Sequence, residues 1–291
     1  MRQAIFGKSG VAIAVAAFLA GCATREAGVV AAPVASTQAV SMKPVELTAP
    51  DGRSVALYVT APARPRGVIL FSHGGGSTPL ATPKLTAALL ADGFAVLAPL
   101  HTDSLSLPAE RRTNLQAALT TRVADQKLAA SYAAQRFAGL PVGAVGFSYG
   151  SLIALMSAGA VPVVPAAVSA VKAVVMFSSP GPIGPLTGAP NAFSAVTAPT
   201  LLVTGTADTV PGMVPNPASH LLYFDQLPAG GRMALLVNGA THSFPKGEEV
   251  GFEGAITVVR MFLAAEVLGD VKADARLRQL SSTDQIEVRR R

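Results

Sequence analysis

The chain carries the stretch VGAVGFSYGSLIALM at residues 142–156, and this stretch decides how the rest is interpreted. Residues 142–147 form an apolar run of the length of a buried strand, and the residues after Ser148 have the composition of a helix. Gly146 and Gly150 lie two positions before and two positions after Ser148, which permits a sharp turn between the two elements. We therefore predict that Ser148 stands at the carboxyl end of a buried strand and offers its hydroxyl as a nucleophile.

A serine hydroxyl needs a histidine base that is oriented by a carboxylate, and few residues of this chain can fill these roles. After Ser148 the chain has two histidines, His220 and His242. Between Ser148 and His242 it has two acids, Asp208 and Asp225. An acid that lies between the nucleophile and the base is therefore one of these two.

Their positions favour Asp208 and His242, because each follows a predicted buried strand at the sheet edge where ligands bind in open α/β folds. Asp225 falls inside a predicted helix, so we expect it to be a surface charge. His220 stands at the start of the same helix and is interpreted as a surface or capping residue. The sequence thus predicts a Ser148, Asp208 and His242 triad.

A glycine-rich segment, SHGGG at residues 72–76, follows another predicted strand. Its glycines allow backbone amides to approach a ligand, and the amide of Gly75 or Gly76, paired with that of Tyr149, would form an oxyanion hole. We interpret His73 as a hydrogen-bonding residue that shapes this loop. His101 follows the next strand and is either a pocket residue or a structural one.

The pattern along the chain predicts a mostly parallel sheet with helices on both faces. An opening hairpin (45–48 and 55–60) precedes buried strands at 67–72, 94–98, 142–147, 173–177, 201–205 and 233–237, alternating with helices at 79–91, 109–137, 149–158, 218–227 and 252–268. We expect one domain over residues 44–268, followed by a charged, solvated tail at 269–291.

The connection at residues 178–200 is rich in proline and glycine and is too short for an elaborate lid. It supplies Ile183 and Phe193 as candidate pocket residues. A short or accessible substrate is therefore favoured over a deeply buried long lipid.

The N-terminus has the pattern of an export signal. Basic residues precede a short apolar centre, and the segment ends in Leu19-Ala20-Gly21-Cys22, which resembles the lipobox of bacterial lipoproteins. This resemblance implies a signal peptide at 1–21, lipidation of Cys22, a flexible tether at 22–43 and, because Ala23 follows, attachment at the periplasmic face of the outer membrane. Cys22 is the sole cysteine, so no intramolecular disulfide can form.

Composition excludes two other classes of protein. Hydrophobic residues make up 50% and charged residues 14% of the 291 positions, which is typical of a globular chain and not of a disordered one. The net charge of +6 comes from scattered basic residues, and the chain has no tryptophan, so nucleic-acid binding is disfavoured. The 21 uncharged residues at 151–171 reach the length of a membrane span, but prolines interrupt them and they coincide with a predicted buried helix.

Four segments together resemble the α/β-hydrolase family over residues 45–268. Within it the chain is similar to the branch of dienelactone hydrolases, platelet-activating-factor acetylhydrolases and polyester hydrolases. The similar segments are HGGG (73–76), ADGFAVLAP (91–99), RVAD (122–125) and GATH (239–242). The chain departs from this branch in two ways. Dienelactone hydrolases proper use a cysteine nucleophile, whereas this chain has Ser148 at that position. Polyester hydrolases of this branch carry pocket tryptophans, whereas this chain has no tryptophan.

The resemblance implies a serine carboxylic-ester hydrolase that acts on a small-molecule ester through an acyl-enzyme. Ser148 would be the nucleophile, Asp208 the acid and His242 the base, with oxyanion amides from Gly75 and Tyr149, and no metal or cofactor is implied. Two alternatives stay open at this point: acyl transfer or peptide hydrolysis by the same triad, and a catalytically silent envelope lipoprotein that uses the fold for binding.

Overall fold

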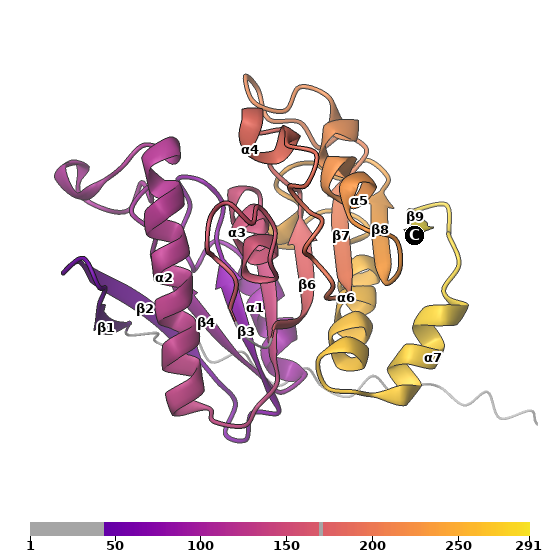
Figure 1. Cartoon of the computed structure of the whole chain (residues 1–291). Helices are drawn as coiled ribbons and strands as arrows, with labels where there is room; N and C mark the ends of the chain where they lie inside the picture. Colours follow the sequence, from indigo (N-terminus) through magenta and orange to yellow (C-terminus); the bar gives the residue numbers. More distant parts are fainter. Residues whose placement is uncertain (1–43, 169–170) are drawn as a thin grey trace, which may run out of the picture. The chain divides into compact units, whose positions relative to one another are not determined.

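The computed structural model describes residues 44–168 and 171–291, which lie within one compact unit (Figure 1). The expected signal peptide (1–21), Cys22 and the tether up to residue 43 lie outside the described residues. In the described part of the chain, none of the helices combines the length and the apolar character needed to cross a bilayer.

A nine-stranded sheet organises the unit. Its spatial order is β1-β2-β4-β3-β5-β6-β7-β8-β9. The strands from β4 to β8 run parallel to one another, whereas β1, β2 and β9 pair antiparallel with their neighbours. The strands are β1 (Val45–Thr48), β2 (Ser54–Thr60), β3 (Gly67–Ser72), β4 (Phe94–Pro99), β5 (Val142–Phe147), β6 (Val171–Phe177), β7 (Thr200–Gly205), β8 (Arg232–Val237) and β9 (Ile286–Arg290).

Helices cover both faces of the sheet. Those of the described residues are α1 (Pro83–Ala91), α2 (Leu115–Arg136), α3 (Tyr149–Ser157), α4 (Gly184–Gly188), α5 (Leu222–Gln226), α6 (Phe252–Glu266) and α7 (Val271–Gln279). Figure 1 looks onto the side of α2 and α3, with the strands behind them.

The core lies on the two faces of the sheet because strand side chains alternate between them. In β3, Ile69 and Phe71 pack with the cluster that contains α1 and α6, whereas Val68 and Leu70 pack against α2. All six residues of β3 are buried, so both faces are apolar. This double burial explains why the parallel strands are continuous apolar runs in the sequence.

Most of the predicted elements are confirmed, and three helices differ in detail. The helix expected over 79–91 begins at Pro83. The helix expected over 109–137 is a short 3₁₀ turn (Ala109–Arg111) followed by α2, because Asn114 ends the intervening loop by accepting a hydrogen bond from the Ala117 amide at 2.9 Å. The helix expected over 218–227 is a 3₁₀ helix (Pro217–Leu221) that leads into α5.

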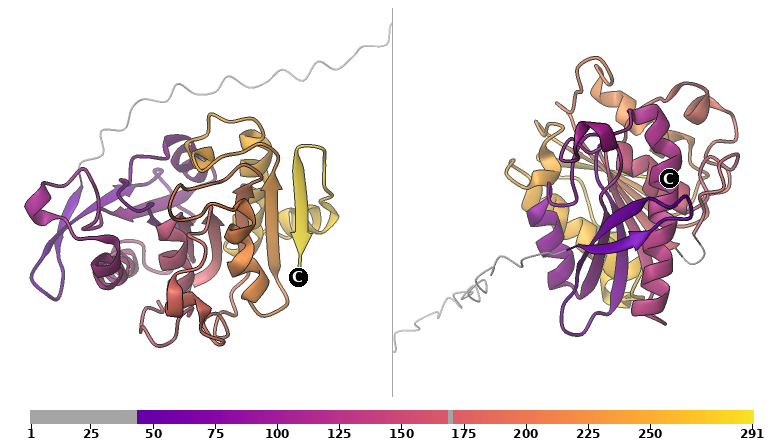
Figure 2. Two further views of the ribbon diagram at one scale, coloured as in Figure 1. Left: turned by 90° about the horizontal axis from the view of Figure 1, so that it is seen from above. Right: turned by 90° about the vertical axis from the view of Figure 1, so that its left-hand side faces the viewer.

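The expectation of a solvated tail after residue 268 is wrong. Asp270 caps α7 by accepting hydrogen bonds from two backbone amides, and Leu277 of α7 is buried in the core. β9 then pairs with β8 at the edge of the sheet, where Figure 2 shows it in yellow. Ile286 and Val288 are partly buried against the core, with the exposed Glu287 between them. Charged side chains are typical of an exposed edge strand.

Candidate active site

Ser148 occupies a strained turn between β5 and α3. Its φ of 51° and ψ of −121° lie outside the regions that a residue with a Cβ ordinarily adopts. Its amide donates to the Phe177 carbonyl at 2.8 Å, and its own carbonyl accepts from the Ser151 amide at 2.8 Å. These bonds hold the turn, and Ser148 is half-buried at the carboxyl end of β5, as the sequence predicts.

The two glycines of the turn are required by close backbone approach. A Cβ on Gly146 would overlap the carbonyl oxygen of Gly150, and a Cβ on Gly150 would overlap that of Ser72. The absence of side chains therefore lets α3 start directly against the end of β3. This contact brings the Ser148 turn beside the segment that follows β3.

Asp208 lies in the loop after β7 and is fully buried. One carboxylate oxygen, Oδ2, accepts from the Thr204 hydroxyl at 2.9 Å. The other, Oδ1, lies 2.8 Å from Nδ1 of His242. Burial alone would raise the pKa of Asp208, but hydrogen bonds from His220 and His242 outweigh it and hold this pKa well below its usual value. Asp208 is therefore an ionised, oriented acceptor.

His242 lies in the loop after β8, with about a quarter of its side chain exposed (24%). Its ring centroid is 5.0 Å from that of Phe147, the residue before Ser148. Thr241 is held by Glu249, which accepts from its amide at 2.7 Å and from its hydroxyl at 2.6 Å. The structure thus brings His242, Asp208 and the Ser148 turn to one place.

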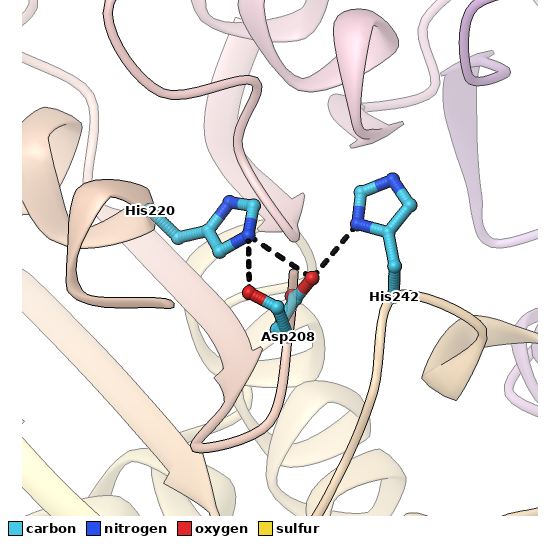
Figure 3. Close-up of side chains that lie close together, drawn as sticks. All are labelled: Asp208, His220 and His242. Atoms are coloured by element: carbon cyan, nitrogen blue, oxygen red, sulfur yellow. Dashed lines mark hydrogen bonds and ion pairs between the residues drawn. The ribbon is translucent and has the colours of Figure 1, made fainter. Parts of the chain in front are cut away.

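The expectation that His220 is a surface or capping residue is wrong. Its side chain is fully buried, and Nε2 lies 3.0 Å from Oδ1 of Asp208. Figure 3 shows Asp208 between the two imidazoles, with the second ring nitrogen of His242 directed away from the carboxylate. The rings of His220 and His242 are stacked with centroids 5.9 Å apart. Asp225, by contrast, is exposed on α5, as expected.

Asp208, His220 and His242 form the group of described residues whose ligand atoms come close enough to hold a metal ion, within 4.8 Å of one another. The hydrogen bonds argue against that use. Nε2 of His220 faces the Asp208 carbonyl oxygen at 3.1 Å as well as Oδ1, so it carries a proton and has no free lone pair. We therefore assign these three residues to a hydrogen-bonded chain.

A buried arginine holds the glycine-rich loop after β3. Arg122 of α2 donates to the carbonyls of His73 at 2.7 Å and Gly74 at 3.0 Å, and it binds both oxygens of Asp103 at 2.8 Å. Asp103 in turn accepts from the Gly76 amide at 3.0 Å. Burial would raise the pKa of Asp103, but Arg122 lowers it to about 2.

This network narrows the choice of oxyanion amide. The Gly76 amide is committed to Asp103, which leaves Gly75 as the better candidate of the two. Gly74 packs directly on the nucleophile turn, because a Cβ there would lie 3.4 Å from the Ser148 Cβ. The loop is thus fixed beside Ser148 with the Gly75 backbone exposed.

His101 is held in a buried hydrogen-bonded network, which favours the structural alternative over a pocket residue. It is fully buried, with Nε2 2.9 Å from the Ser72 hydroxyl and Nδ1 3.0 Å from Asp125. Asp125 also accepts from Arg53 at 3.0 Å. Burial raises the pKa of Asp125 to about 6, although Arg53 works in the opposite direction.

A cavity of about 570 Å³ opens beside Tyr149. Its walls come from the start of α2, the start of α3 and the segment around α4: Leu115, Gln116, Leu119, Tyr149, Pro180, Pro182, Ile183, Gly184, Pro185, Leu186 and Met213. Ile183 is therefore a lining residue. Phe193 is not, because it is buried in the core with its ring 4.9 Å from that of Tyr223. The expectation for Phe193 is wrong because a buried aromatic and a pocket aromatic look alike in a loop sequence.

The parallel sheet and the strand–turn–helix serine define an α/β hydrolase. A family model described as PET hydrolase-like matches residues 20–263, and the chain belongs to this family. A solved structure of a dienelactone hydrolase from Anabaena variabilis is similar in fold, with 22% sequence identity and a TM-score of 0.57, covering 78% of this chain and 98% of that chain. No curated protein sequence matches the chain. The protein is a hydrolase of the α/β-hydrolase superfamily, as the resemblance implied.

The sequence did not reveal three residues that shape this site. His220 sits in an ordinary helix-start sequence, and nothing local connects it to Asp208, twelve residues earlier. Glu249 lies eight residues after Thr241, with no motif that links them. Arg122 was visible only through the similar segment RVAD, although a lone arginine among the apolar positions of a helix is itself a signal of a buried charge pair.

Proposed function

We propose that the protein is a serine carboxylic-ester hydrolase that works through a Ser148, His242 and Asp208 triad. The observation that carries this proposal is the 2.8 Å contact between Nδ1 of His242 and the buried Asp208 carboxylate, at a ring that packs on Phe147 beside Ser148. An ionised carboxylate is an acceptor only, so Nδ1 of His242 donates to it. Nε2 of the neutral ring is then the free base.

In the first half of the reaction, the Ser148 hydroxyl oxygen attacks the ester carbonyl carbon while Nε2 of His242 accepts the hydroxyl proton. The tetrahedral oxyanion is stabilised by the backbone amides of Tyr149 and Gly75. When the intermediate collapses, the ester C–O bond breaks and His242 returns its proton to the departing alcohol. The product of this half is an acyl group on Ser148.

In the second half, water replaces the alcohol. The water oxygen attacks the acyl carbonyl carbon while His242 accepts a proton from the water. The bond between the acyl carbon and the Ser148 oxygen then breaks, and His242 returns the proton to Ser148. Asp208 stays ionised throughout, because its role is to orient His242 and to stabilise the imidazolium. The cycle releases a carboxylic acid and an alcohol.

The cavity beside Tyr149 suggests which esters fit. Its lining is mostly apolar, with leucine, isoleucine and proline side chains and the exposed Met213. A volume of about 570 Å³ is that of a small-molecule pocket. Esters with a short apolar acyl or aryl group are therefore the proposed substrates, which supports a small-molecule esterase more than an enzyme for long lipids.

The test compares parent and Ser148→Ala on a panel of aryl esters of increasing acyl length. We expect turnover of the short esters, and a loss of about 10⁴-fold or more in kcat for the variant, because the covalent route is removed. A folded parent without ester turnover would favour the silent binding protein. Turnover that rises with an added alcohol or amine acceptor would favour acyl transfer, and cleavage of amide substrates would favour a peptidase.

We also propose that the hydrolase is held at the bacterial envelope by lipid on Cys22. The lipobox-like Leu19-Ala20-Gly21-Cys22 supports this attachment. Stable anchoring needs more than one acyl chain, which a lipidated N-terminal cysteine carries.

A further inference from the structure

Three of the four histidines have fully buried side chains, and their partners determine where their protons lie. A neutral imidazole donates through one nitrogen and accepts at the other. His101 meets this condition: Nδ1 faces the Asp125 carboxylate, and Nε2 faces the Ser72 hydroxyl, which can donate. Burial, followed by the charge of Arg122, holds the pKa of His101 well below its usual value. His101 is therefore neutral.

His73 meets the same condition. Its Nδ1 faces the Gly74 carbonyl at 2.8 Å, and its Nε2 accepts the backbone N–H of His101 at 3.1 Å. Burial and the neighbouring His101 hold the pKa of His73 well below its usual value. Two buried histidines thus serve as internal examples of neutral rings.

His220 differs because both of its nitrogens face atoms that only accept. Nδ1 makes a short contact with the Ser179 carbonyl oxygen. Nε2 faces the Asp208 carbonyl oxygen at 3.1 Å and the Asp208 carboxylate at 3.0 Å. A neutral ring would leave a lone pair against an oxygen lone pair, in a place without solvent. Only the doubly protonated ring satisfies both sides.

We propose that His220 is an imidazolium in the folded protein at neutral pH and that it is a positioning residue, which shares the Asp208 carboxylate with His242. The positioning role rests on the proposed esterase function, whereas the charge state does not. Burial disfavours the charged ring, but the hydrogen bond and charge of Asp208 outweigh burial and raise the pKa of His220. The charge is present below this raised pKa and is lost as the pH rises through it.

The groups around His220 agree with this charge state. The loop after β7 supplies Asp208, the loop after β8 supplies His242, and the segment after β6 supplies the Ser179 carbonyl. The Ser179 hydroxyl donates to the His220 carbonyl at 2.7 Å and so does not face the ring. Among these groups Asp208 is the charged partner, and the stacked ring of His242 is the neighbour that accepts the Ser148 proton in the proposed reaction.

A positive charge on His220 changes how the triad responds to pH. When His242 accepts the Ser148 proton, or a proton from acidic solvent, the second positive charge forms in a ring stacked 5.9 Å from that of His220. Two positive rings at this distance repel each other, so the charge on His220 couples esterase activity to pH on the acid side of the profile.

Nitrogen NMR of the full chain, with ¹⁵N-labelled histidine, tests the charge without any turnover. The protein has only four histidines, so single substitutions assign the signals. At pH 7 we expect both ring nitrogens of His220 to show protonated shifts, while those of His101 show one protonated and one free nitrogen. A free ring nitrogen on His220 at pH 7 would overturn the proposal.

The catalytic part is tested by kcat/KM against pH for two variants. His220→Gln keeps an uncharged donor near the position of Nε2, and we expect the acid limb of its kcat/KM profile to move upward by about one pH unit, with a smaller loss of turnover at the optimum than in His220→Asn. His220→Asn keeps a donor only toward Ser179, so we expect it to lose turnover at the optimum as well. Asp225→Asn, an exposed charge change on α5, is the matched control and should leave the acid limb in place.

An acid limb that does not move in a folded His220→Gln would contradict the positioning role. If one variant does not fold, the pH profile of the other variant still tests the positioning role, and the NMR shifts of the parent still test the charge of His220. Absence of ester turnover in the parent would instead refute the proposed function, and the NMR result would then stand by itself. The two failures are thus distinguishable.

Discussion

Asp208 is buried and accepts hydrogen bonds from Thr204, His220 and His242 among others, whereas Asp225 is exposed on α5. Asp208→Asn keeps the size of the side chain but removes the charge that orients and stabilises the His242 imidazolium. We expect a loss of about 10⁴-fold in turnover, as in another serine triad. Asp225→Asn should stay near parental activity. Ester turnover with folding checked by circular dichroism compares the two, and severe loss only at Asp225 would contradict the assignment.

Gly75 offers a backbone amide beside the nucleophile turn. A Cβ at this position would lie 2.8 Å from Leu115 Cδ2, so a side chain displaces the loop or the leucine. For Gly75→Val we expect turnover to fall by about 10²- to 10³-fold, the usual effect of one lost oxyanion donor, with a smaller effect on stability. Gly188→Val is the control, because nothing lies within 4 Å of its Cβ position. Parental kcat in Gly75→Val would place the oxyanion hole on other amides.

Some residues of the site could be predicted and others could not, for a physical reason. Ser148, Asp208 and His242 each follow a buried apolar strand, and parallel strands deliver their following loops to one edge. That rule needs no knowledge of side-chain packing. His220 contacts Asp208 because of the course of the loop after β7. Local sequence does not determine that course, so the burial of His220 could not be predicted.

At the scale of the elements, the buried side chain of Arg122 connects α2 to the glycine-rich loop through hydrogen bonds. Its partners are the Asp103 carboxylate and two loop carbonyls. Arg122→Met leaves these acceptors without donors, so we expect the free energy of unfolding to fall by about 3–5 kcal/mol. Denaturant titration measures this change.

The control for Arg122 is another arginine that binds an aspartate through two nitrogens. Arg260 contacts Asp92 at 2.6 and 2.8 Å, but its side chain is 42% exposed. Arg260→Met should cost under about 1 kcal/mol. Equal losses of unfolding free energy in the two variants would contradict the expectation that the buried Arg122 network stabilises the fold more than the exposed Arg260 pair does.

Elements were predicted best where burial is continuous. The six parallel strands of the core are apolar runs because both faces are covered, and these runs were recognised. The break before α2 was missed although Asn114, a residue typical of helix N-caps, marks it. The sequence does not predict β9, because charged residues dominate positions 285–291 and the partial burial of Ile286 and Val288 depends on a sheet edge that only the fold provides.

At the scale of the whole molecule, the predicted anchor and the hydrolase unit are separate features of the chain. Cys22→Ser removes the thiol that the lipobox would lipidate, so we expect the variant to leave the membrane fraction while aryl-ester turnover is kept. Cell fractionation with metabolic fatty-acid labelling measures both. Unchanged membrane partitioning of Cys22→Ser would place the attachment elsewhere.

The most direct test of the central claim is covalent capture of the nucleophile. The full chain is treated with a fluorophosphonate, which reacts with activated serines, and the adduct is located by mass spectrometry. We predict a single adduct on Ser148, formed more slowly when an excess of a short aryl ester is present during labelling and absent in Ser148→Ala. A folded protein that takes up no probe, or takes it up on another residue, would contradict the account.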